Sequence, residues 1–354
     1  MTGDREQKIL EQLQDAAAEG TPVCITGGGT KGFLGGQPRG IPLDVSGHRG
    51  IISYEPKELV ITARCGTPLA ELESVLAGSG QMIGFEPPAF GEHATLGGTI
   101  AAGLSGPRRP YAGSARDFVL GVRMLNGHGQ NLRFGGEVMK NVAGYDISRL
   151  MTGAMGTLGV ILEVSLKVLP IPALETTLVQ SRSPSDALDA MVNWARSPLP
   201  LSAACSDGER LYVRLSGAAS AVNAAREIIG GEPMEEGEAF WRDRVREHGH
   251  AFFRNAGPLW RISVPATATT EMLPGSWFIE WGGAQRWLRT DLQPKAVQAA
   301  AAEAGGHATC FRGGDRQAGV YQPLSESLMR LHRNLKQAFD PQGLFNPGRL
   351  YPDF

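Results

Sequence analysis

Glycine is the residue type that most constrains how this chain can fold. The 354-residue sequence contains 47 glycines, and they are concentrated between Gly27 and Gly159. Glycine loses more conformational freedom on folding than any other residue, so folds use it where the backbone takes positive φ or passes close to another group. The distribution therefore indicates that the N-terminal half of the chain binds the ligand.

The first glycine-rich loop, Gly27 to Gly32, follows a strand expected at 22–26. Its letters match GxGxxG, but the dinucleotide-binding motif requires a helix directly after the glycines. Residues 33–42 contain three glycines and two prolines, which cannot sustain a helix. Successive glycine N–H groups can instead form a concave nest for a pyrophosphate, with Thr30 adding a hydroxyl and Lys31 a charge. A plain strand-to-loop turn explains this loop equally well.

A second segment, TLGGTIAAGLSG at 95–106, is dominated by small residues. Small side chains let a backbone pass beside a flat ring system and a sugar–phosphate chain. The two glycine-rich segments together favour a large nucleotide-like ligand over a simple turn.

Four signatures resemble the vanillyl-alcohol oxidase and p-cresol methylhydroxylase group of flavoproteins. They are GGGT at 27–30, TLGGTIAAGLSGP at 95–107, GTLGVI at 156–161, and the C-terminal pair FDP at 339–341 and NPGRL at 346–350. The resemblance implies an α+β fold: a two-subdomain FAD-binding domain of the p-cresol methylhydroxylase type, then an α+β cap domain, then a C-terminal helix that returns to the FAD-binding domain.

The resemblance also assigns residues to FAD. It places the pyrophosphate on the first loop, the ribityl chain and flavin on the second, and backbone groups of the third signature on the cofactor. The residues expected to bind FAD are Gly27, Gly28, Gly29, Thr30, Lys31, Thr95, Leu96, Gly97, Gly98, Ala101, Gly103, Ser105, Gly106, Asp117, Val160 and Ile161. Some members attach FAD through a histidine in the first loop. None occurs there, and His93 is interpreted as a loop residue, so the FAD is expected to be non-covalent.

Residues 139–146 and 311–314 resemble, more narrowly, the FAD-binding subunits of bacterial glycolate oxidases. That resemblance implies a complex with a second flavin subunit and an iron–sulfur subunit. The complex would oxidise glycolate or a similar 2-hydroxy acid to the 2-oxo acid and pass the electrons through flavin to the iron–sulfur partner. A stand-alone FAD-dependent 2-hydroxy-acid dehydrogenase and a non-catalytic flavin subunit remain alternatives.

The catalytic dehydrogenases of this group carry a metal-binding HxxGDGNxH motif, which is absent from this sequence. We therefore assign no catalytic base and no metal ligand from the sequence. His307 and Cys310 alone do not make a metal-ligand set, and a packed or exposed histidine is favoured. Three further alternatives stay open. Tyr145 and Asp146 either orient the substrate or flavin or form the turn that starts a helix, with Asp146 as N-cap. Arg108 and Arg109 either hold a carboxylate or the flavin's developing negative charge or, as is favoured, form a solvated loop pair. Arg312 and Arg316 form either a carboxylate site or a surface that faces a partner.

Composition excludes several classes of protein. A net charge of −2 gives no long-range attraction to nucleic acid or to anionic membranes. The four cysteines are widely spaced, so neither a zinc site nor iron–sulfur ligands are indicated, and free thiols suit a reducing compartment. No apolar run reaches the roughly 18 residues of a membrane span. A cytoplasmic protein is expected, with peripheral attachment to the inner membrane through the complex left open.

Two prolines mark the expected domain boundary. Pro170 and Pro172 close a strand expected at 158–168, which predicts an FAD-binding domain at 1–172 and a cap at 173–324. Asn126-Gly127 between two apolar runs predicts a β-hairpin. Residues 325–354 are expected to return to the FAD-binding domain, with Leu328, Leu331 and Leu335 packing on it from one helical face.

Overall fold

The computed structural model describes all residues except 1–2, 137–145, 271, 317–318 and 353. The chain forms two compact units. Unit 1 consists of Met1–Leu104, Ser114–Pro170 and Pro323–Phe354, and unit 2 consists of Ser105–Gly113 and Ile171–Gln322. The segment Ser105–Gly113 thus belongs with unit 2, although the sequence had placed it in the 1–172 domain. The functional names of the domains stay a prediction.

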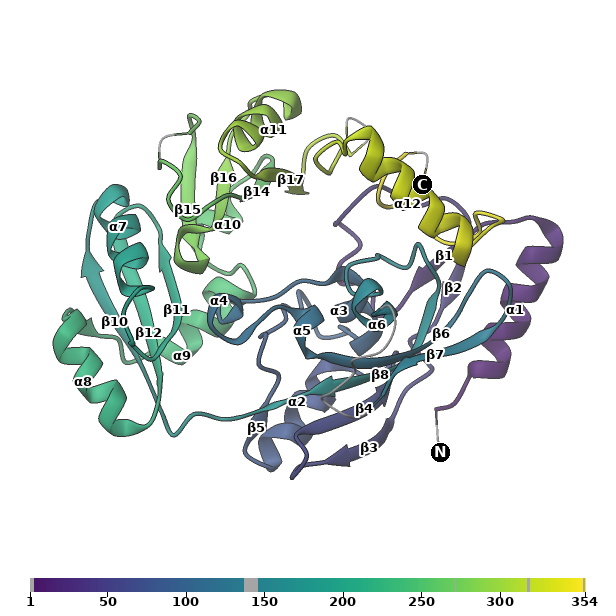
Figure 1. The fold of residues 1–354 in the computed structure, drawn as a ribbon, viewed down its shortest axis with the longest axis horizontal. Coiled ribbons are helices and arrows are strands. Elements are labelled where there is room, and N and C mark those ends of the chain that lie inside the picture. Colours follow the sequence, from purple (N-terminus) through teal and green to yellow (C-terminus); the bar gives the residue numbers. More distant parts are fainter. Residues whose placement is uncertain (1–2, 137–145, 271, 317–318, 353) are drawn as a thin grey trace. The chain divides into compact units, whose positions relative to one another are not determined.

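Unit 1 contains a five-stranded antiparallel sheet in the order β3-β4-β8-β6-β7 (Figure 1). Its strands are β3 (Ile51–Glu55), β4 (Val60–Arg64), β6 (Val119–Leu125), β7 (Asn131–Gly135) and β8 (Val160–Lys167). The hairpin between β6 and β7 is confirmed, since Leu125 pairs with Asn131. The Asn126 side chain closes this turn, because its Oδ1 accepts the N–H groups of His128 and Gln130 at 3.0 Å each.

Two short pairs complete the strands of unit 1. Strands β1 (Val23–Thr26) and β2 (Ile41–Asp44) are parallel, and β5 (Gln81–Met82) is antiparallel to β9 (Leu169–Pro170). The sequence at 81–85 predicts a strand, but β5 contains only its first two residues. The Glu86 N–H donates to the Ile83 carbonyl and Glu86 has a φ of 45°, so the chain turns there instead of continuing the ladder.

The helices of unit 1 are α1 (Glu6–Glu19), α2 (Leu69–Gly78), α3 (Leu96–Ala102), α5 (Ala115–Phe118), α6 (Ile147–Leu150) and α12 (Glu326–Phe339). Helix α1 buries Ile9, Leu13 and Ala16, which lie on one face at helical spacing, and ends at Gly20 with a φ of 63°. Helix α6 begins at Asp146, whose Oδ1 accepts the Arg149 N–H at 3.0 Å. Asp146 is therefore an N-cap, whereas Tyr145 and the rest of 139–145 lie outside the described residues.

Unit 2 contains an eight-stranded sheet in the order β13-β10-β12-β11-β15-β16-β14-β17. Its strands are β10 (Leu174–Ser181), β11 (Leu201–Ser206), β12 (Arg210–Gly217), β13 (Glu232–Pro233), β14 (Leu259–Ser263), β15 (Ser276–Glu280), β16 (Gln285–Arg289) and β17 (His307–Arg312). Its helices are α4 (Arg109–Ala112), α7 (Pro184–Trp194), α8 (Ala219–Ile229), α9 (Gly237–Ala239), α10 (Ala251–Arg254) and α11 (Pro294–Glu303), with a π-helical segment Phe240–Arg246 and a 3₁₀ turn Trp281–Gly283.

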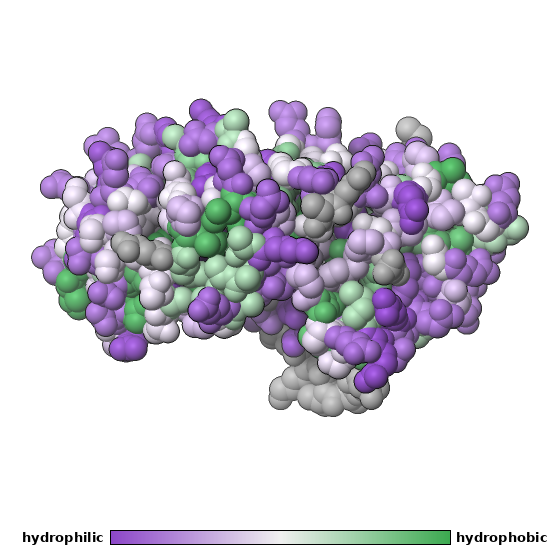
Figure 2. All heavy atoms as spheres, turned by 90° about the horizontal axis from the view of Figure 1, so that it is seen from above, coloured by the Kyte–Doolittle hydropathy of each residue, from purple (hydrophilic) through white to green (hydrophobic). Residues whose placement is uncertain are grey.

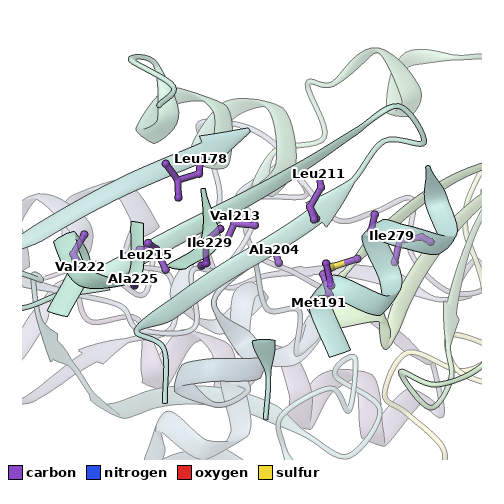
Figure 3. Close-up of a cluster of buried hydrophobic side chains, with 12 residues drawn as sticks. Leu178, Met191, Ala204, Leu211, Val213, Leu215, Val222, Ala225, Ile229 and Ile279 are labelled. Carbon is purple, nitrogen blue, oxygen red and sulfur yellow. The ribbon is translucent and has the colours of Figure 1, made fainter. Parts of the chain in front are cut away.

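The sheet of unit 2 carries two apolar clusters on the face that is covered by helices. The first joins Leu178, Val213 and Leu215 from the strands to Met191 of α7 and Val222 of α8 (Figure 3). The second joins strands β14, β16 and β17 to α11. Because side chains alternate along a strand, the intervening residues point to the opposite face of the sheet.

The predicted packing of the C-terminal helix is wrong in its details. Helix α12 belongs to unit 1, but Leu328 is 47% exposed and Leu331 is 52% exposed. Contacts of Lys336, at the C-terminal end of the helix, attach it instead. Elsewhere, Figure 2 shows polar residues over most of the visible face with apolar residues in small groups. No helix in the described part of the chain is long and apolar enough to cross a membrane.

Candidate functional site

The first glycine loop forms one wall of a pocket in unit 1. Strand β1 leads directly into this loop. The pocket has a volume of about 150 Å³. Residues from the first loop, from α3 and from the C-terminal segment line it together. They are Cys24, Ile25, Thr26, Gly27, Gly28, Gly29, Thr30, Lys31, Gly32, Pro38, Thr95, Gly98, Ala101, Ala102, Met155, Asn346 and Arg349.

The loop presents backbone donors that the described part of the protein does not use. None of the amide N–H groups of Gly27, Gly28, Gly29 and Thr30 donates to another described residue. An unpaired backbone N–H is costly unless it finds a partner in water or a ligand. Four successive donors on a concave loop match the oxygen atoms of a pyrophosphate, so this donor set fits the diphosphate of FAD.

Two cationic side chains hold the same loop. Lys31 is 8% exposed, and its ammonium donates to the Ala89 carbonyl at 3.2 Å. Arg349 donates to the carbonyls of Lys31 at 3.1 Å and Gly36 at 3.2 Å, which attaches the C-terminal segment to the loop. The Thr30 hydroxyl donates to the Ala89 carbonyl at 2.7 Å, so in this arrangement it serves the protein and not a phosphate.

The second loop meets the first at the start of α3. Thr95 is the N-cap of this helix, with its Oγ1 accepting the Gly98 N–H at 3.3 Å. Of the second-loop residues predicted to bind FAD, Thr95, Gly98 and Ala101 line the pocket.

The other predicted residues lie outside this lining, each for a structural reason. Leu96 is buried, a Cβ on Gly97 would lie 2.6 Å from Cys65 Cβ, and Gly103 ends α3 with a φ of 63°. Asp117 is exposed and accepts the Ser114 N–H and hydroxyl in a capping box. Four more lie elsewhere: Val160 and Ile161 are buried in β8, while Ser105 and Gly106 belong to unit 2. For all of these, FAD contact stays a prediction.

Sequence reasoning missed the lining residues Cys24, Ile25, Thr26, Gly32, Pro38, Ala102, Met155, Asn346 and Arg349. Asn346 carried a usable signal, because it begins the NPGRL signature. Its Oδ1 accepts the Ile25 N–H and its Nδ2 donates to the Met155 carbonyl, both at 2.7 Å. One side chain thus joins β1, the turn before β8 and the C-terminal segment, and an asparagine supplies both the acceptor and the donor that this position needs.

A buried ion pair fixes the end of α12. The Lys336 ammonium donates to Asp340 Oδ2 at 2.7 Å, to the Thr157 carbonyl at 2.7 Å and to the Phe345 carbonyl at 2.9 Å. Asp340 in turn accepts the N–H groups of Leu344 and Phe345. Burial lowers the pKa of Lys336, and the Asp340 carboxylate opposes that shift. This cluster attaches the end of α12 to unit 1, whereas Leu328 and Leu331 of the helix are exposed.

The neighbouring residues Arg108 and Arg109 of unit 2 have different environments in the structure. Arg108 is buried and pairs with Glu175 at 2.7 Å, so it is not the solvated loop residue that the sequence favoured. Arg109 is exposed and lies over the Trp281 ring, 4.4 Å from its centroid.

His307 and Cys310 are three apart on β17 and so point to opposite faces of the sheet. No group of three potential metal ligands occurs in the part of the chain that the structure describes.

Two known domain families match parts of this chain. Residues 2–135 match the model of an FAD binding domain, and residues 312–350 match the C-terminal domain of FAD linked oxidases. The chain is 50% identical over 350 residues to glycolate oxidase subunit GlcE of Escherichia coli, which covers 99% of this chain and 98% of that protein. The chain belongs to the GlcE family of FAD-linked oxidases. FAD is the cofactor of this GlcE family member, which is an oxidoreductase.

More distant relatives share only part of this GlcE family chain. Glycolate oxidase subunit GlcD of Bacillus subtilis is 31% identical over 45% of the chain, and a D-lactate dehydrogenase of Anaerostipes hadrus is 32% identical over 45%. These matches cover 34% and 33% of the two relatives. Among solved structures, p-cresol methylhydroxylase superimposes with a TM-score of 0.71 over 98% of this chain and 87% of its own, at 15% identity. That likeness confirms the predicted α+β fold of the p-cresol methylhydroxylase type.

Proposed function

We propose that this chain is the FAD-binding subunit of a glycolate oxidase complex, which oxidises glycolate or a similar 2-hydroxy acid to the 2-oxo acid. The observation that carries the proposal is the full-length identity of 50% to a glycolate oxidase subunit. The unpaired N–H donors of Gly27 to Thr30 support the FAD part of it independently. The D-lactate dehydrogenase among the relatives supports a CH–OH group of a 2-hydroxy acid as the group oxidised.

Bound FAD would supply the hydride acceptor for the substrate, and the residues of the unit 1 pocket would hold and orient it. The loop 27–30 binds the pyrophosphate through its backbone N–H groups, while Lys31 and Arg349 place positive charge beside it. The partners are a second flavin subunit and an iron–sulfur subunit, which receives the electrons. A cytoplasmic complex, attached peripherally to the inner membrane through its partners, fits a chain of this composition.

The purified chain is expected to retain FAD without a covalent bond. Absorbance spectra of the native protein should show flavin, and denaturation followed by filtration should release all of it. His93 is the histidine nearest the second loop and is exposed, so His93→Ala should retain as much FAD as the wild type. Protein that stays colourless after incubation with FAD, or flavin that stays attached after denaturation, would contradict this part of the proposal.

Turnover is expected to depend on the other subunits. The chain alone should reduce an artificial dye only slowly with glycolate, because it lacks the HxxGDGNxH motif. Co-purification with the second flavin subunit and the iron–sulfur subunit should restore glycolate-dependent dye reduction by at least two orders of magnitude, the scale of a missing acid–base group. Full turnover by the isolated chain would instead support the stand-alone dehydrogenase.

A further inference from the structure

The face of the unit 2 sheet opposite α7, α8 and α11 carries a buried carboxyl group, Glu280, which is not part of the FAD pocket. Glu280 ends β15 and is 5% exposed. It pairs across the ladder with Cys205 on one side and with Gln285 on the other, so all three side chains point to the same face. Isolated carboxylates are rarely buried without a charged partner in direct contact.

The two oxygen atoms of Glu280 differ in their surroundings. Oε1 accepts the Trp287 indole N–H at 2.6 Å and the amide of Gln285. No described residue donates a hydrogen bond to Oε2. Burial raises the pKa of Glu280 to about 7, and the donors and Arg261 oppose that shift. Glu280 is therefore held in place by one oxygen and has the other available.

Arg261 of β14 lies on the same face, directly across the ladder from Trp287. Its guanidinium makes no hydrogen bond and no ion pair with any described residue, and it lies 5.8 Å from the centroid of the Phe311 ring. Burial lowers the pKa of Arg261, with Arg109 acting in the same direction and Glu280 and Tyr321 opposing it. A half-buried guanidinium with five unused donors is matched to an anion, most specifically to a carboxylate.

The two groups attract each other but do not touch. Each influences the pKa of the other, yet no ion pair joins them within 4.0 Å. A pair that served only to hold the sheet together would close that gap, since separated buried charges lose the Coulomb energy that offsets their desolvation. Trp287 lies on β16, the strand between theirs; its indole N–H donates to Glu280, and its backbone pairs with that of Arg261.

We propose that Arg261 and Glu280 form a binding site for a small 2-hydroxy acid on this chain. Arg261 binds the carboxylate of the ligand, and Oε2 of Glu280 accepts the hydrogen bond of the hydroxyl group on the adjacent carbon. The inference deepens the proposed function and rests on it, since it assigns the substrate site to this subunit. It also supplies the two groups that sequence reasoning did not find, a carboxylate-binding arginine and an acceptor for the hydroxyl proton.

The test measures binding of glycolate and of acetate, which lacks the hydroxyl group, to the FAD-loaded full chain by calorimetry. Arg261→Gln should weaken the binding of both acids at least tenfold. Glu280→Gln should weaken glycolate but not acetate, so that the preference of the wild type for glycolate is lost. Arg210→Gln removes an exposed arginine from β12 of the same sheet and should leave both affinities unchanged.

Flavin absorbance separates this inference from the proposed function. Both site variants should retain FAD to the wild-type level, because the FAD pocket lies in unit 1. If the wild-type chain binds no glycolate, or if Arg261→Gln binds it as tightly as the wild type does, the inference is wrong. If the reconstituted complex oxidises glycolate normally with either variant, the substrate site belongs to another subunit while the proposed function stands.

Discussion

Gly28→Ala is expected to abolish FAD retention and to destabilise unit 1. A Cβ at this position would lie 1.4 Å from the carbonyl oxygen of His93 and 2.4 Å from its carbonyl carbon. These are backbone atoms of the adjoining loop, so no side-chain rotation can relieve the overlap. The first loop must move away from the second, which opens the pocket and misplaces the N–H donors. Overpacking of this kind costs at least about 1–3 kcal/mol.

The measurement is the flavin-to-protein ratio after gel filtration, together with the free energy of unfolding in urea. Gly78→Ala is the matched control, since its Cβ would have no heavy atom within 4 Å. Gly78 ends α2, where alanine should be neutral or stabilise by up to about 1 kcal/mol. Retention of wild-type FAD by Gly28→Ala would show that the two loops are not packed as described.

Asp340→Ala is expected to loosen the end of α12 and to cost about 3–5 kcal/mol of unfolding free energy, the scale for breaking a buried ion pair. Asp340 is 1% exposed, and its carboxylate binds the Lys336 ammonium and two backbone N–H groups. Without it, the ammonium loses its counter-charge and two buried donors lose their acceptor. Because Asn346 follows directly and lines the FAD pocket, the variant should also lose flavin.

Urea unfolding and flavin content measure this effect. Asp15→Ala removes an exposed carboxylate from α1 of the same unit and should change stability by no more than about 0.5 kcal/mol. Asp340→Asn retains one oxygen acceptor, enough for one of the two backbone N–H groups, but not the charge, so it should fall between alanine and the wild type. A stable, yellow Asp340→Ala protein would show that α12 is attached to unit 1 by other contacts.

Local patterns predicted several secondary-structure elements of this protein and its cofactor. Asn126-Gly127 predicted the hairpin, and of the two alternatives for Asp146 the structure shows the helix start. These predictions hold because turn geometry and helix capping depend on residues within a few positions of one another. The glycine loops carry their signal in the same way, since a nest of N–H groups is built from consecutive residues.

Contacts between segments that are distant in the chain could not be predicted from the sequence. The helical spacing of Leu328, Leu331 and Leu335 predicted a buried face, but periodicity describes one helix and not what covers it. Likewise, Gly28 has to be glycine because the backbone of His93 lies against it. No local sequence pattern predicts this contact.

The same limit applies to the charged groups of unit 2. Nothing near Arg108 in the sequence reveals Glu175, and nothing near Glu280 reveals Arg261. The sequence alone determined the family, the cofactor and the local elements, because each is encoded in short runs. Only the tertiary structure decided which side chains face each other, because desolvation and pairing depend on three-dimensional neighbours that lie tens to hundreds of residues apart in the chain.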